Sequence, residues 1–89
     1  MKAVITVTGK DSVGIIAKVS ALCAKYGANI VDITQSVLSE YFAMIMLTDI
    51  GVLNVSFDQF VDSLNELAKS NNLDIHTMHE DIFNAMHRI

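Results

Sequence analysis

The sequence contains no proline or tryptophan, four glycines and a single cysteine, Cys23. A lone cysteine cannot form an internal disulfide, so the pattern of a disulfide-stapled secreted scaffold is excluded and a reducing compartment is expected. The scarcity of proline and glycine predicts a compact fold without long loops. Because two domains sharing 89 residues would each lack a sufficient core, we expect one domain over residues 1–89.

Basic residues are also few, with six Lys and Arg against ten Asp and Glu, a net charge of -4. The field of such a chain repels a phosphate backbone, so no nucleic-acid partner is expected. The first eight residues are apolar at only a few positions and are interrupted by threonines, which makes them too short for a signal peptide or a membrane span. We therefore expect a cytoplasmic protein without a membrane partner.

Apolar residues, by contrast, are abundant. They make up 52% of the chain, above the usual level of about 45–50%, which predicts association into a homodimer or a larger oligomer. Residues 41–47 have no polar side chain on either face of a strand, so we expect this strand to be covered from both sides. A charge at Met44 or Met46, whichever faces the partner, should then dissociate the oligomer.

The spacing of apolar residues predicts the order of helices and strands. Residues 2–8, 28–38, 41–47 and 73–78 have the composition of strands, and Ser39-Glu40 supplies a tight turn between the second and third. A helix is expected over residues 12–26, with Asp11 or Ser12 as its N-terminal cap and Gly27 closing it. Its predicted apolar stripe comprises Ile15, Val19, Leu22 and Tyr26, flanked by Ile16 and Cys23.

A second helix begins at the capping-box pattern Ser56-Phe57-Asp58-Gln59 and is expected to end at Asn71-Asn72. The tail, at about 80–89, places Ile82, Phe83, Met86 and Ile89 on one side, which suggests a short helix that docks on the domain or on a partner. The fold class is therefore α+β, with a ferredoxin-like β-α-β-β-α-β order. Two helices should cover one face of an antiparallel sheet, with the short C-terminal helix appended.

The segment after the first strand has the chemistry of a binding site. Free N–H groups at the start of the first helix, from about Val13 to Ile15, can hold a ligand carboxylate, and Asp11 can pair with an ammonium group. We expect this corner to face the start of the second strand, where Asn29 offers both a donor and an acceptor. The predicted ligand-binding residues are Lys10, Asp11, Ser12, Val13, Gly14, Ile15, Asn29 and Ile30.

The pattern formed by Asp11-x-x-Gly14, an aliphatic helix to Tyr26, and then residues 27–30 (Gly-Ala-Asn-Ile), resembles the ACT-domain family. The resemblance implies domains that pair through their sheets or helices, bind amino acids at the interface and regulate an attached or partner enzyme. It identifies the chain as a small stand-alone ACT protein that acts on a partner in trans, without a cofactor. Val13 departs from the family's pattern, in which a proline often precedes the glycine.

A ligand-free protein–protein interaction module of the same fold is the alternative. In that case Asp11 is an ordinary helix cap, Gly14 only relieves crowding, and Asn29 bonds its own turn. Titration against amino acids distinguishes the two functions.

Metal binding and catalysis are weaker hypotheses. His76, His79 and His87 lie near Glu80 and Asp81 in the sequence, but His76 and His79 point to opposite faces of a strand, so we expect solvated histidines and no metal site. No nucleophile with an adjacent base is visible, so we expect no enzymatic activity.

Overall fold

The computed structural model describes residues 1–10 and 13–86. Its elements are β1 (Lys2–Gly9), α1 (Ile15–Tyr26), β2 (Asn29–Leu38), β3 (Tyr41–Asp49), α2 (Phe57–Asn71), β4 (Asp74–His79) and α3 (Glu80–Met86). This confirms the β-α-β-β-α-β order and the short C-terminal helix. Two residues named above, His87 and Ile89, lie outside the described part of the chain.

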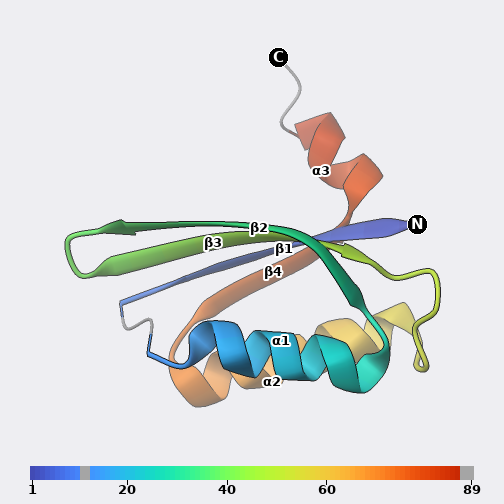
Figure 1. Ribbon diagram of the computed structural model, residues 1–89, viewed down its shortest axis with the longest axis horizontal. Helices are drawn as coiled ribbons and strands as arrows, with labels where there is room; N and C mark the ends of the chain where they lie inside the picture. Colours follow the sequence, from blue (N-terminus) through green and yellow to red (C-terminus); the bar gives the residue numbers. More distant parts are fainter. Residues whose placement is uncertain (11–12, 87–89) are drawn as a thin grey trace.

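The four strands form an antiparallel sheet in the order β2-β3-β1-β4. Both long helices, α1 and α2, cover one face of this sheet, as predicted (Figure 1). The short helix α3 leaves the end of β4 on the other face, which we call the open face (Figure 1). No helix among residues 1–10 and 13–86 is long and apolar enough to cross a membrane.

The central strand β3 alternates between the two faces. Phe42, Met44 and Met46 are buried under the helices, whereas Tyr41 and Ile45 are about half exposed on the open face. The helices thus cover one face of β3, and cover of its open face by a second copy stays a prediction. Met44 and Met46 lie two residues apart and so share the helix-covered face, which means that neither can face a partner across the open side.

The open face is also more polar than β3 alone suggests. In the strand register, Ile45 lies between Thr6 of β1 and Thr34 of β2, and residues directly opposite in an antiparallel pair share a face. Ala43, two residues before Ile45 on the same face, lies between Thr8 and Ser36, which also carry hydroxyl groups. These polar neighbours flank Ile45 and Ala43 on both sides, so the apolar surface there is limited to the strip along β3.

Helix α1 packs its apolar stripe on the sheet, with Ile15, Val19 and Cys23 buried. Leu22, predicted in the centre of the stripe, is only partly buried, so the stripe is centred nearer Cys23. The predicted closure at Gly27 is confirmed, because Gly27 is left-handed and the following N–H donates to the carbonyl of Cys23 at 2.8 Å.

The start of α1 differs from the prediction. Gly14 occupies the N-cap position, with a left-handed backbone and no side-chain cap, in place of Asp11 or Ser12. The structure of Asp11 and Ser12 lies outside the described residues. The first-turn N–H groups consequently belong to residues 15–17, about two positions later than expected.

Helix α2 begins and ends where the sequence predicts. The backbone N–H of Gln59 donates to the Ser56 side-chain oxygen at 3.1 Å, and Asn72 adopts the left-handed conformation that ends the helix. Phe60 and Leu64 are fully buried and complete the core beneath the sheet. The α2–β4 turn is thereby fixed beside the end of β1.

Candidate functional site at the end of the sheet

The structure places the predicted site residues at two opposite ends of the molecule. Gly14 directly precedes α1 and Asn29 follows its end, and a helix of 12 residues is about 18 Å long. Asn29 pairs with Asp49 at the end of the sheet where β1 begins, whereas β1 leads into Lys10 at the other end. The expectation that the two corners converge within one chain is therefore wrong, since β2 starts where α1 ends.

The backbone conformation of Gly14 accounts for a glycine at this position. Its φ of 73° is in the left-handed region, which favours glycine. Among the described residues, a Cβ there would meet only the Lys18 side chain, at 3.9 Å. Val13 beside it is exposed, but Ile15 is buried and can offer a ligand only its backbone.

Lys10 leads from the end of β1 into this corner. Its ammonium lies over the ring of Tyr41, with Nζ 5.9 Å from the ring centroid. This contact connects the loop after β1 to the first residue of β3, a neighbour that the sequence analysis did not assign to the site.

Two adjoining cavities surround Tyr41, and we call them together the Tyr41 hollow. One, of about 330 Å³, is lined by Thr8, Gly9, Lys10, Tyr41, Asn72, Leu73 and Asp74. The other, of about 310 Å³, is lined by Thr8, Gly9, Ser36, Leu38, Tyr41, Phe42 and Ala43. Of the predicted residues that the structure describes, only Lys10 lines the hollow. The remaining lining residues were not predicted, because the strand register brings them together and no local sequence motif encodes that register.

The corner at residues 27–30 is largely structural. A Cβ on Gly27 would lie 2.9 Å from the Val52 carbonyl oxygen, so the glycine permits the loop before α2 to pack closely. The Asn54 side chain donates to the carbonyl of Lys25 at 2.9 Å and holds the same loop in place. Asn29 itself is exposed, so its amide is accessible to a ligand or a partner.

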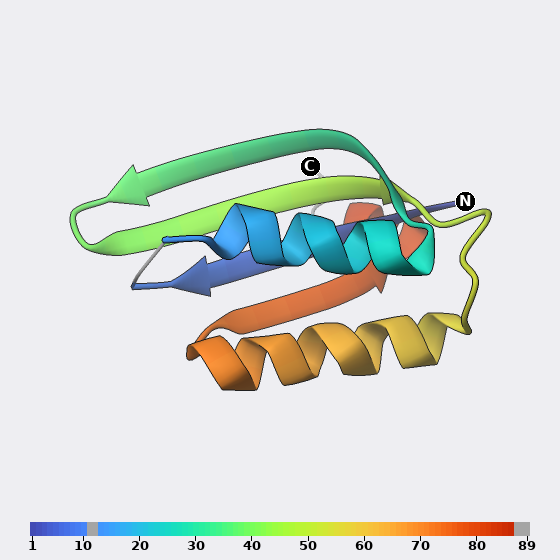
Figure 2. The same ribbon diagram turned by 60° about the horizontal axis from the view of Figure 1, so that its bottom comes forward.

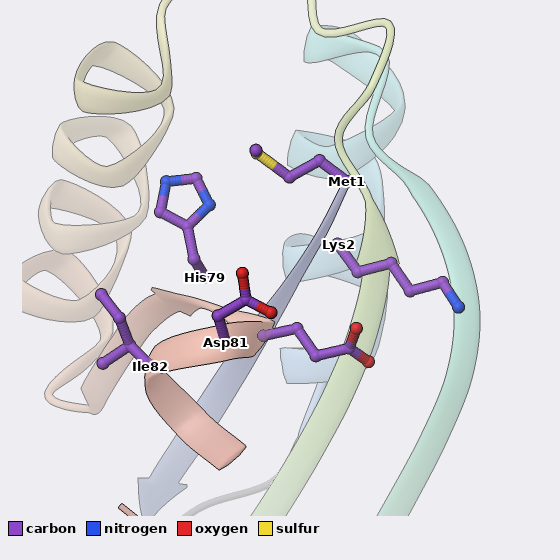
Figure 3. Close-up of a pocket in the computed structure, with 6 residues that line it drawn as sticks. Met1, Lys2, His79, Asp81 and Ile82 are labelled. Atoms are coloured by element: carbon purple, nitrogen blue, oxygen red, sulfur yellow. The ribbon is translucent and has the colours of Figure 1, made fainter. Parts of the chain in front are cut away.

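A further cavity of about 410 Å³ lies near the N-terminus, lined by Met1, Lys2, His79, Glu80, Asp81 and Ile82. Figure 3 shows that these residues come from the start of β1, the end of β4 and the beginning of α3. The His79 ring stacks on Phe57 with centroids 4.2 Å apart. None of the predicted site residues that the structure describes lines this cavity, in which the carboxylates of Glu80 and Asp81 accompany the ammonium group of Lys2.

Within residues 1–10 and 13–86, no group of three or more His, Cys, Asp and Glu side chains is arranged to hold a metal ion. His76 and His79 belong to opposite faces of β4, as expected from their spacing. Cys23 is fully buried, and burial raises the pKa of its thiol to about 11. A protonated, inaccessible thiol does not act as a nucleophile.

Comparison with known proteins gives matches over most of the chain. A family model of the ACT domain matches residues 2–78. A UPF0237 protein of Clostridium acetobutylicum is 51% identical, with 100% of both chains covered. The structure of an ACT domain protein from Streptococcus pneumoniae is 39% identical, with a TM-score of 0.81 over 98% of each chain. The ligand-free regulatory subunit of aspartate kinase from Thermus thermophilus shares the fold, with a TM-score of 0.65, 21% identity, and coverage of 86% of this chain and 50% of that one.

Proposed function

This chain belongs to the ACT-domain family of regulatory, small-molecule-binding modules, and on that premise we propose that it binds an amino acid or a related carboxylate at a subunit interface. The bound oligomer then regulates a partner protein in trans and performs no catalysis of its own. Lys10 and the backbone around Gly14 supply one side of the site, and Asn29 of a second copy supplies the other.

The separation of Gly14 from Asn29 is the observation that carries this proposal. Within one chain the two corners are a helix length apart, so a ligand cannot contact both. In a two-fold dimer whose α1 helices run antiparallel, the start of α1 in one copy lies beside its end in the other. Asn29 of the second copy then approaches Gly14 of the first, and the dimer contains two equivalent sites.

Strand β2 provides the surface for such a pairing. It is an edge strand of the sheet, and almost all of its side chains are exposed. Val31, Val37 and Leu38 expose 48%, 66% and 77% of their surfaces, which is unusual for valine and leucine on an unprotected edge. Antiparallel pairing of two β2 strands would cover this edge and orient α1 as the site requires.

Isothermal titration against a panel of amino acids tests the proposal. We expect binding to the wild-type chain, and binding weaker by a factor of roughly 5 to 150 in Asn29→Ala, because one or two hydrogen bonds to the ligand are lost. Asn65→Ala, at an exposed position on α2, is the matched control and should bind as the wild type does.

Two results would favour the alternative, a protein–protein interaction module without a ligand. One is the absence of binding by any amino acid at millimolar concentration. The other is equal binding by wild type and Asn29→Ala, which would leave the corner at residues 27–30 with only its structural role. In the ligand-bound case, addition of the amino acid should also tighten the dimer, since a ligand that prefers the dimer must stabilise it.

A further inference from the structure

Two rows of side chains cross the open face at the end of the sheet where β1 and β2 finish. The strand register aligns Asp74, Thr8, Ala43 and Ser36 in the first row. In the second row Tyr41 faces Leu38, and Lys10 continues β1 beside the Tyr41 ring. Residues opposite one another in antiparallel strands share a face, so both rows line the Tyr41 hollow.

The cavity on the β4 side of the hollow carries one charge of each sign. Lys10, which follows β1, and Asp74, the first residue of β4, both line it, as does Asn72 of the α2–β4 turn. Within residues 1–10 and 13–86, neither Lys10 nor Asp74 has an ion-pair partner, and the recorded contact of Lys10 is with the Tyr41 ring. Lys10 is therefore available to the negative charge of a zwitterionic ligand, and Asp74 to its positive charge.

The cavity on the β2 side is apolar. The side chains of Leu38 and Ala43 line it together with the Tyr41 ring, and its polar side-chain groups are the hydroxyls of Thr8, Ser36 and Tyr41. Such a lining accepts a hydrocarbon side chain of the ligand. A charged ligand side chain would find no partner of opposite charge there, and burial of an unpaired charge costs free energy. The two cavities adjoin, because Thr8, Gly9 and Tyr41 line both of them. Their volumes are near the lower limit of ligand pockets, roughly 300 Å³.

The geometry points to a free α-amino acid with an uncharged, apolar side chain, of the size of leucine or phenylalanine, as the ligand of the Tyr41 hollow. Lys10 binds its carboxylate, Asp74 binds its ammonium group, and its side chain lies against Leu38 and Ala43. This inference rests on the proposed function and adds the ligand class and the residues that select it. Leu38 is the last residue of the edge strand β2, along which the proposed dimer forms.

The ammonium contact can be isolated by comparing leucine with 4-methylpentanoate, which is leucine without its ammonium group. Wild type should bind leucine at least roughly tenfold more tightly, as a hydrogen-bonded charge pair provides. Asp74→Asn should bind the two molecules about equally. Asp62→Asn, at an exposed position on α2, is the control and should keep the wild-type preference.

The apolar contact is tested by filling the cavity. Ala43→Leu, at an exposed position of β3, should weaken leucine binding by roughly tenfold without changing the melting temperature, since its added side chain occupies the ligand's space. Ala24→Leu, on the exposed side of α1, should bind leucine as the wild type does. Glycine and glutamate should bind the wild type more weakly than leucine.

The outcomes separate this inference from the proposed function. If wild type binds leucine but Asp74→Asn and Ala43→Leu bind it equally well, the ligand lies elsewhere and the inference is wrong while the proposed function stands. A preference for glutamate or glycine would also overturn the ligand class. If Ala43→Leu changes the oligomer mass and leaves binding unchanged, the hollow is a protein contact. No amino-acid binding by wild type would overturn both.

Discussion

Val37 and Phe42 face each other across the β2–β3 pair on the helix-covered side of the sheet, yet Val37 is 66% exposed and Phe42 only 3%. Near the hairpin the cover provided by the helices therefore ends between β3 and β2, whereas Ile33, closer to the start of β2, still packs against the core. The hairpin formed by these strands extends past the start of α1 in both views (Figures 1 and 2). The uncovered apolar edge of β2 is the surface on which the proposed dimer depends.

A charge on this edge should dissociate the dimer. Val37→Glu places a carboxylate on each side of the two-fold axis, where desolvation and mutual repulsion oppose pairing. Because Val37 is exposed in the single chain, the fold should survive. Sedimentation velocity at micromolar concentration should give a dimer for wild type and a monomer for Val37→Glu.

Ile45→Glu is the matched control, since Ile45 is 47% exposed but lies on the open face, among threonines. It should remain dimeric. Dissociation of Ile45→Glu with an intact Val37→Glu dimer would mean that the chains pair face to face, and a monomeric wild type would exclude the interface site altogether.

The position of the core predicts that two leucine-to-alanine substitutions lower the free energy of unfolding by unequal amounts. Leu64 of α2 is fully buried, and its replacement by Ala should lower the free energy of unfolding by roughly 2–5 kcal/mol. Leu22 is only partly buried, so Leu22→Ala should cost less, and Lys18→Ala, at an exposed position, should cost least. Urea unfolding measures all three. Equal losses at Leu64 and Leu22 would contradict the orientation of α1.

Burial of Cys23 makes stability depend on pH above neutrality. Its pKa in the folded chain is about 11, against 9.0 for an unperturbed thiol, so between these values the folded state retains a proton that the unfolded state has lost. The corresponding stabilisation, on the order of 2–3 kcal/mol, is present in full when the thiol is neutral and decreases as pH rises above 9. Cys23→Ala should show a shallower decline in stability between pH 9 and 11. Identical slopes in urea unfolding would contradict this assignment.

The sequence predicts most of the fold because its signals are local. The capping box at Ser56 and the left-handed closures at Gly27 and Asn72 each depend on neighbouring residues, and each was found where expected. The N-terminus of α1 was placed too early because Asp11 and Ser12 are good caps, while Gly14 holds the position through its backbone conformation.

The candidate site was less predictable because it depends on register and on chain direction. Lys10 could be identified from the loop after β1, but its neighbours Tyr41 and Asp74 reach it only through strand pairing. The prediction that Asn29 lies beside Gly14 was wrong within one chain. Helix α1 runs back along the sheet, so the residues before its start and after its end are about a helix length apart. Only an interface between two copies, which no single-chain pattern describes, could restore that proximity.

The most direct test of the interface site is calorimetric titration of mixed dimers. Asn29→Ala and Lys10→Met homodimers should each bind the amino acid weakly. A purified heterodimer of the two variants contains one site in which both contributing residues are intact and one in which both are replaced. We predict one wild-type-affinity site per heterodimer. Absence of any such site, with a heterodimer as weak as its parents, would show that each site is built within a single chain and would contradict the account.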